Sequence, residues 1–196
     1  MSVEPPVSRL HPHQLMLYAG LCSISVLFLV ITLAYALSKP AWNWAQFRFP
    51  KVFLLSTLAL VASSFTVHAA TLAYERDNTL RLRQMLSYTL YLSLMFVVGQ
   101  FLGWYQLYRA GIYLAGKPDG SYLYLLTGLH VVHVLGGLVA LFLLFWHTQK
   151  HLGEPVAELL FYTNAQQKIR LGMIATYWHF VDGLWVYLLL FFLFNH

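Results

Sequence analysis

The sequence contains very few charged residues. Asp, Glu, Lys and Arg make up 10% of its 196 residues, while hydrophobic residues make up 59%. Because a soluble domain carries roughly a quarter of its residues as charged side chains, this shortage excludes an ordinary soluble enzyme and a disordered tail. The formal net charge is +5, but the 12 Lys and Arg residues are scattered singly between apolar blocks, which argues against a nucleic-acid-binding surface.

Cysteine and the common catalytic motifs are also scarce or missing. The single cysteine, Cys22, lies inside an apolar block, so the chain can form no intrachain disulfide and has no cysteine pair for metal or redox chemistry. The sequence contains no phosphate-binding loop, no G-x-S-x-G and no H-E-x-x-H. It therefore predicts a membrane subunit whose chemistry resides in a partner.

Long apolar stretches dominate what is present. A bilayer core of about 30 Å requires roughly 20 apolar residues in helical form. The stretches are continuously apolar and do not alternate with period two, so they predict helices and not a barrel. We expect an all-α integral membrane protein, with residues 1–196 forming a single membrane domain as a five-transmembrane-helix bundle. The predicted spans are residues 14–38, 52–74, 84–108, 121–148 and 171–194.

The distribution of basic residues predicts the orientation in the membrane. Five spans place the two termini on opposite sides. The side that holds the N-terminal tail carries seven Lys and Arg residues, and the other side carries five. Because cytoplasmic loops carry the excess of Lys and Arg, we expect the N-terminus inside and the C-terminus outside. Tryptophans near the span ends are expected to anchor the membrane interfaces: Trp42, Trp44, Trp104 and Trp146.

Four ionisable residues lie at membrane depth. His130 and His133 are three residues apart on the fourth span, and His179 and Asp182 are three apart on the fifth. At about 1.5 Å of rise per residue, both pairs lie roughly 12 to 20 Å deep. Because the two spans are sequential and antiparallel, we expect all four groups to meet near the midplane. An Asp facing a His would offset the burial cost of both.

Three interpretations of this cluster remain open. It can be a structural polar network that fixes helix packing, or a proton-handling or regulatory group. It can also be a metal or haem site, because neutral imidazoles and a carboxylate bind transition metals. Other polar and small residues predict helix packing through close backbone approach and interhelical hydrogen bonds. These are Ser63, Ser64, Gly99, Gln100 and Gly103.

Two runs of residues resemble subunit III of haem-copper terminal oxidases, the cytochrome c oxidase subunit 3 family. Thr127–Gly136 reads T-G-L-H-V-V-H-V-L-G and resembles the family's T-G-x-H-x-x-H-V run. Tyr177–Asp182, followed by Trp185, resembles the family's Y-W-H-F-V-D-x-x-W signature. The resemblance covers about residues 51–194. It implies the short five-helix bacterial form, which lacks the first two helices of the seven-helix members.

The resemblance implies a non-catalytic subunit of a proton-translocating oxidase in the bacterial inner membrane. Such a subunit carries no haem or copper of its own, since these cofactors belong to partner subunits I and II. It packs against subunit I, binds phospholipid and supports proton uptake and complex stability during oxygen reduction. Its expected partners are subunits I and II, membrane phospholipids and, beyond them, a larger respiratory supercomplex.

Alternatives to this interpretation differ in the electron donor or in the class of protein. Within the same family, the oxidase can use quinol in place of cytochrome c, or the chain can be a relative associated with a nitric oxide reductase. In another class, His130, His133 and His179 would make the chain a haem b or metal-carrying membrane anchor. A small transporter using Asp182 as its coupling acid is a further alternative, although no inverted repeat supports it.

Overall fold

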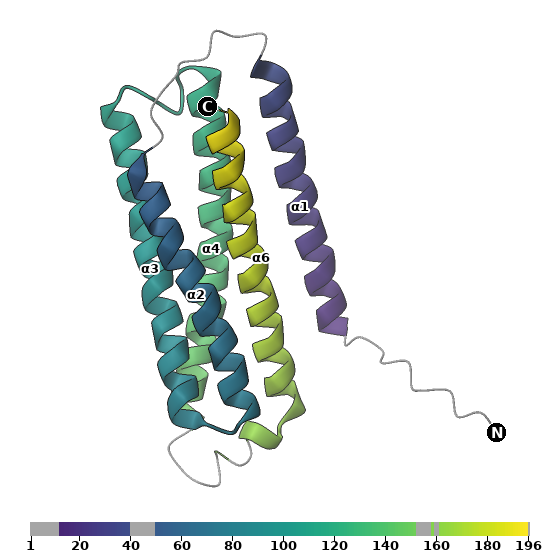
Figure 1. Ribbon diagram of the computed structural model, residues 1–196. Coiled ribbons are helices and arrows are strands. Elements are labelled where there is room, and N and C mark those ends of the chain that lie inside the picture. Colours follow the sequence, from purple (N-terminus) through teal and green to yellow (C-terminus); the bar gives the residue numbers. More distant parts are fainter. Residues whose placement is uncertain (1–11, 40–49, 152–157, 159–160, 196) are drawn as a thin grey trace, which may run out of the picture.

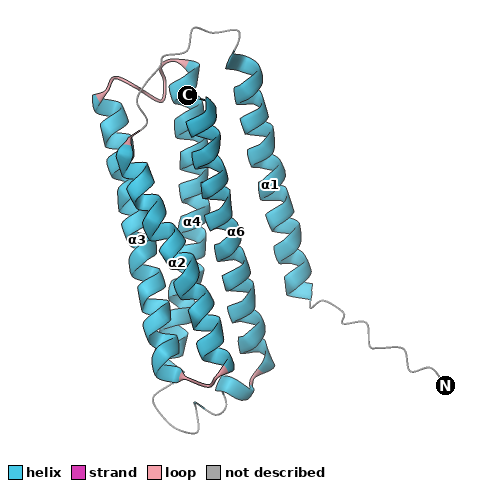
Figure 2. Ribbon diagram, in the orientation of Figure 1, coloured by secondary structure: helices cyan, strands magenta, loops and turns pink. Residues whose placement is uncertain are grey.

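The computed structural model describes residues 12–39, 50–151, 158 and 161–195. Within these residues the chain is helical and has no strand (Figure 2). In this part of the chain, five helices are long and apolar enough to cross a membrane, which confirms the predicted all-α fold with five spans. They are α1 (Pro12–Ser38), α2 (Lys51–Glu75), α3 (Thr79–Arg109), α4 (Pro118–His151) and α6 (Ala165–Asn195).

All five helices begin earlier than the predicted spans, and α3 and α6 show the largest differences. α3 starts at Thr79 and α6 at Ala165, ahead of the predicted starts at residues 84 and 171. Charged residues such as Arg81 and Lys168 interrupt the apolar pattern without interrupting the helix, because a long charged side chain can reach water from the end of a span. α1 starts at Pro12, since proline fits a first helical turn, where its missing N–H is not needed.

α2 and α3 form a tight antiparallel pair. The chain reverses at Asp77, whose φ of 51° lies in the left-handed region. Asn78 then caps α3, because its side chain accepts a hydrogen bond from the Arg81 N–H at 3.0 Å. Further along the pair, the hydroxyls of Thr66 and Thr89 share a hydrogen bond of 2.8 Å across the two helices.

The helices divide into a group of four and a fifth that stands beside it. α2, α3, α4 and α6 pack together, whereas α1 packs on α4 and α6 and stands at the side of the bundle (Figure 1). The start of α1, the end of α4 and the start of α6 lie at the same end of the bundle. α1 contributes few buried residues to the core: Leu21, Phe28, Thr32 and Tyr35.

Candidate functional site

Two tryptophans of the Y-W-H-F-V-D-x-x-W run fix α6 against α2. The Trp178 Nε1–H donates to the Ser63 hydroxyl at 3.0 Å, and the Trp185 Nε1–H donates to the Thr57 hydroxyl at 2.8 Å. Both indoles are almost completely buried. Because the hydrocarbon core offers no alternative partner to an N–H group, these two bonds determine how α6 is rotated about its own axis.

His179 and Asp182 of the same run face α2 as well. The His179 Nδ1 and the Ser64 hydroxyl share a hydrogen bond of 2.6 Å, and the ring of His68 lies 6.3 Å from the His179 ring. Ser64 also lies beside the Asp182 carboxylate, which is 5% exposed. Among the described residues, however, neither carboxylate oxygen of Asp182 has a hydrogen-bond partner.

His130 of α4 lies in the aromatic interior of the four-helix group. Its ring centroid is 5.8 Å from that of Phe96 and 5.0 Å from that of Trp185. The side chain is fully buried, and neither ring nitrogen has a hydrogen-bond partner in the described part of the chain. The packing is therefore aromatic and not polar.

His133, one turn further along α4, points towards α1. Its Nδ1 bonds to the carbonyl of Leu129 in its own helix at 2.7 Å, and its ring contacts the edge of Phe28 in α1. The His133 carbonyl accepts a hydrogen bond from the Tyr177 hydroxyl at 3.0 Å. Tyr177 thus links α6 to α4, as the two tryptophans link it to α2.

Within the described residues, the four ionisable residues do not share one hydrogen-bonded network. His130 packs between Phe96 of α3 and Trp185 of α6, and His133 packs on Phe28 of α1. His179 and Asp182 face α2. No hydrogen bond or ion pair joins Asp182 to a histidine in the residues that the structure describes, and no three His, Cys, Asp or Glu residues there lie close enough to hold a metal ion. This arrangement does not fit the single metal centre considered above.

The small and polar residues of α2 and α3 lie between these helices. A Cβ built on Gly99 would lie 2.6 Å from the Cβ of Ser56, and one built on Gly103 would overlap the ring of Phe53. The Gln100 side chain donates to the Ser56 hydroxyl at 3.2 Å. Glycine is therefore required at both positions for the observed distance between α2 and α3.

Two of the tryptophans predicted to anchor the membrane interfaces, Trp104 and Trp146, differ in burial. Trp104 is half-buried and donates its indole N–H to the Thr127 hydroxyl at 3.0 Å, so it joins α3 to α4 instead of reaching a lipid headgroup. Trp146 is 63% exposed on the outside of α4. Trp42 and Trp44 lie outside the described residues.

A cleft of about 970 Å³ separates α1 from α4 and α6. Its deeper wall is apolar and includes Leu17, Ala140 and Met173. Polar side chains gather at the end where α1 and α6 begin, and there Gln167 bonds to the His147 ring at 2.8 Å beside Arg170. The sequence reasoning missed this cleft, since its lining comes from three helices whose rotations were unknown.

Comparison with known proteins identifies the family to which these helices belong. The family model for cytochrome c oxidase subunit III matches residues 40–195, which is more than half of the chain. The chain belongs to this family. The match includes α2, α3, α4 and α6 and does not include α1. The resemblance seen in the two sequence runs is thereby confirmed.

Curated relatives of this subunit III family member come from several bacteria. A "probable cytochrome c oxidase subunit 3" of Mycobacterium leprae is 36% identical over 130 residues, which are 66% of this chain and 59% of the relative. The cytochrome c oxidase subunit 3 of Corynebacterium diphtheriae is 29% identical over 133 residues, 68% of this chain and 60% of the relative. That of Synechocystis is 26% identical over 177 residues, 84% of this chain and 67% of the relative. The chain thus spans about three fifths of the length of the first two relatives.

Proposed function

We propose that this chain is the non-catalytic subunit III of a bacterial respiratory cytochrome c oxidase. The observation that carries the proposal is the family match over residues 40–195, together with relatives named as cytochrome c oxidase subunit 3. In this proposal the chain lies in the inner membrane, packs against subunit I and supports proton uptake and complex stability. Haem and copper are held by partner subunits I and II, which carry out oxygen reduction.

The fixed rotation of α6 supports a scaffolding role. Indole bonds to α2 and a phenol bond to α4 hold α6 in one rotation. A helix held in this way presents the same outer surface to a neighbouring subunit at all times, which lowers the ordering cost of association. We further propose that the end of the bundle where α6 begins faces the cytoplasm, since that end carries Arg76, Arg81, Arg83, Lys150 and Arg170.

The cleft beside α1 supports the binding of one phospholipid. Its apolar wall suits an acyl chain, and its polar end carries the permanently charged guanidinium of Arg170. Guanidinium groups bind phosphate oxygens through paired charge-assisted hydrogen bonds. We therefore propose that Arg170 and Gln167 hold the phosphate of a phospholipid whose acyl chain passes Leu17 and Ala140.

Purification through a tag on this chain tests the oxidase assignment. The complex is expected to contain haem-bearing and copper-bearing subunits and to consume oxygen with reduced cytochrome c. Activity with quinol alone would assign the complex to the quinol oxidases instead. A Soret band from the pure chain, free of other subunits, would overturn the assignment of haem to the partners.

The lipid site is tested by Arg170→Gln in the complex, with Arg81→Gln as the matched control. Arg81 is an exposed arginine near the start of α3, at the same end of the bundle, and does not line the cleft. We expect Arg170→Gln to lower the phospholipid retained per complex about tenfold, the effect of losing one strong charge-assisted hydrogen bond. Native mass spectrometry measures the retained lipid. Equal lipid loss in both variants would contradict a site at Arg170.

A further inference from the structure

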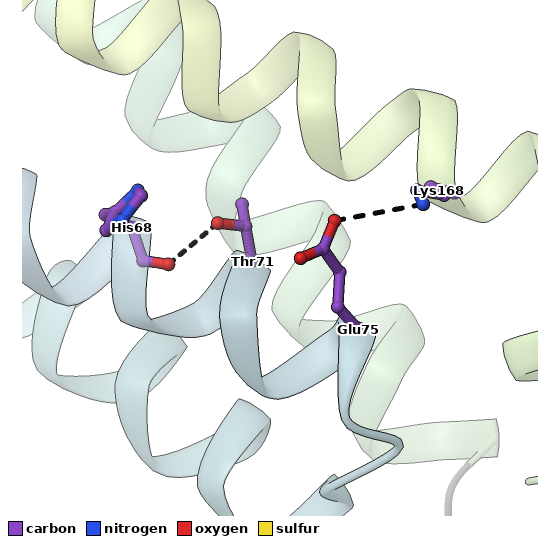
Figure 3. Close-up of polar contacts among 4 residues, drawn as sticks. All are labelled: His68, Thr71, Glu75 and Lys168. Atoms are coloured by element: carbon purple, nitrogen blue, oxygen red, sulfur yellow. Dashed lines mark hydrogen bonds and ion pairs between the residues drawn. The ribbon is translucent and has the colours of Figure 1, made fainter.

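Polar residues line the outer side of α2 where it adjoins α6. Ser64, His68, Thr71 and Glu75 follow one another at intervals of three or four residues, so they share one face of α2. Figure 3 shows His68, Thr71 and Glu75 projecting from the same side of the helix, and Lys168 of α6 reaching Glu75 at 3.8 Å. A polar band therefore extends along α2 from its charged end towards the middle of the span.

The adjoining face of α6 is made of small and polar residues. Lys168, Gly172, Thr176, His179 and Gly183 also follow at intervals of three or four residues. Together with the four α2 residues they form a surface that we call the α2–α6 seam. It is continuous across the two helices, since the Ser64 hydroxyl bonds to His179 Nδ1 at 2.6 Å.

The two glycines of the seam have no packing role within the described chain. A Cβ built on Gly172 or Gly183 would meet nothing within 4 Å among the described residues, whereas one built on Gly137 would lie 2.8 Å from the ring of Tyr177. Glycine inside a helix costs about 1 kcal/mol relative to alanine. In membrane helices, small residues at such spacings allow a second backbone to approach closely.

His179 of the seam lies near the middle of its helix. His179 lies about 21 Å from the start of α6, a helix about 46 Å long at 1.5 Å per residue. Both His179 and His68 are exposed on the surface of the chain. Ionisable side chains at this depth face protein and not lipid, because their exposure to hydrocarbon is costly.

A buried carboxylate directly behind the seam gives a second, independent reason for a contact. Asp182 is 5% exposed, and neither of its oxygens has a hydrogen-bond partner in the described chain. Ser64 lies beside it, but the Ser64 hydroxyl is engaged with His179. A donor from outside that hydrogen-bonds to His179 Nε2 would keep the ring proton on Nδ1, which then donates to the Ser64 oxygen. The Ser64 hydroxyl hydrogen is then available to Asp182, a carboxylate that is otherwise costly to bury.

We propose that the α2–α6 seam binds one transmembrane helix of a partner subunit. The partner backbone packs on Gly172 and Gly183, and a hydroxyl, amide or basic side chain of the partner hydrogen-bonds to His179. A second copy of this chain is a poor occupant, because it would bring another buried Asp182 carboxylate to the same depth. The inference rests on the proposed function, in which the partner is a haem-bearing oxidase subunit.

Gly183→Leu in the tagged chain tests the seam, with Gly128→Leu as the matched control. Gly128 is also an open helical glycine, with nothing within 4 Å of a built Cβ among the described residues, but it lies on α4. We expect Gly183→Leu to reduce the haem that co-purifies with the chain about tenfold, and Gly128→Leu to leave it unchanged. Normal haem recovery with Gly183→Leu, or equal loss with both variants, would overturn the seam as the contact.

A photo-crosslinking amino acid at position 183 tests the contact at the α2–α6 seam separately from the proposed oxidase function. A crosslink to a transmembrane peptide of a haem-bearing subunit supports both. A crosslink to a transmembrane helix of a complex without haem supports the seam and overturns the oxidase assignment. Crosslinks only to lipid, or only to a second copy of this chain, overturn the seam, while co-purified haem in the same sample leaves the oxidase assignment intact.

Discussion

α6 and α1 are both long apolar helices, yet they are held in very different ways. α6 has 31 residues, and Trp178, Trp185 and Tyr177 donate hydrogen bonds from it to α2 and α4. α1 has 27 residues, and a hydrogen bond of 2.8 Å between the hydroxyls of Thr32 and Tyr187 joins it to α6. Near the start of the helix, His13, Met16 and Leu17 line the cleft.

The difference shows what determines specificity inside a membrane. Apolar surface alone gives little preference for one neighbour, because lipid tails are as apolar as leucine side chains. Close backbone contact and paired polar groups give that preference, and the described chain concentrates both in α2, α3, α4 and α6. The family match covers these same four helices and omits α1. We therefore regard the four helices as the scaffold and α1 as an outer helix whose start forms one wall of the cleft.

The largest effect is expected from Gly103→Leu in α3, with Gly20→Leu in α1 as its control. A side chain at position 103 would overlap the Phe53 ring, whereas a Cβ at position 20 would meet nothing within 4 Å in the described chain. We expect Gly103→Leu to lower the free energy of unfolding by about 3 kcal/mol, the cost of overpacking a tight contact. Gly20→Leu should be neutral or slightly stabilising, since leucine favours helix more than glycine.

Both variants are purified in a mild detergent and unfolded by titration with a denaturing detergent. Circular dichroism during the titration measures the change in the free energy of unfolding. Equal destabilisation by Gly20→Leu would show that α1 is packed as tightly as α3, and the division into scaffold and wall would be wrong.

A smaller effect is expected from Thr57→Val, which removes one hydroxyl between α2 and α6. The change is nearly isosteric but leaves the indole N–H of Trp185, a residue 1% exposed, without its acceptor. We expect a loss of about 1 kcal/mol in the free energy of unfolding. Circular dichroism during the same titration measures the change. An unchanged free energy of unfolding would mean that the indole bond does not hold α6.

The sequence predicted the five helices correctly, because spanning helices follow from composition and length. Five apolar stretches with few charges predict five spanning helices, and 1.5 Å of rise per residue predicts that His130 and Asp182 lie at similar depth. The rotation of each helix could not be predicted in the same way. Every span is apolar on nearly all sides, so no amphipathic pattern indicates which face turns inward. For this reason the sequence could not predict that His130 and Asp182 turn to different neighbours within the described part of the chain.

Some rotational information was nevertheless in the sequence. Small residues at G-x-x-x-G spacing mark the side of α3 that contacts α2, where Gly99 and Gly103 lie against Ser56 and Phe53. Trp104 shows the limit of such rules: its position near a span end predicted an interface anchor, but its N–H bonds to Thr127 inside the bundle. The sequence alone does not reveal which hydroxyl on another helix will compete for an indole.

The smallest effect is expected from Thr32→Val, which makes in α1 the same chemical change as Thr57→Val makes in α2. In both helices the threonine hydroxyl bonds to the carbonyl four residues earlier and to an aromatic residue of α6. The aromatic partners differ in burial, since Tyr187 is 42% exposed and can turn its hydroxyl to another acceptor, while the Trp185 N–H cannot. Thr32→Val should therefore lower the free energy of unfolding by about 0.6 kcal/mol or less.

The consequence of Thr32→Val should appear in α1 and not in the scaffold. Loss of the bond between α1 and α6 should increase hydrogen exchange in α1 around residue 32 and leave exchange in α2 and α3 unchanged. A loss as large as that caused by Thr57→Val, or faster exchange throughout the four-helix group, would mean that α1 is an integral part of the scaffold. Comparing the two variants thus shows whether α6, which is held by bonds from buried indoles, is fixed more firmly than α1, whose bond involves an exposed tyrosine.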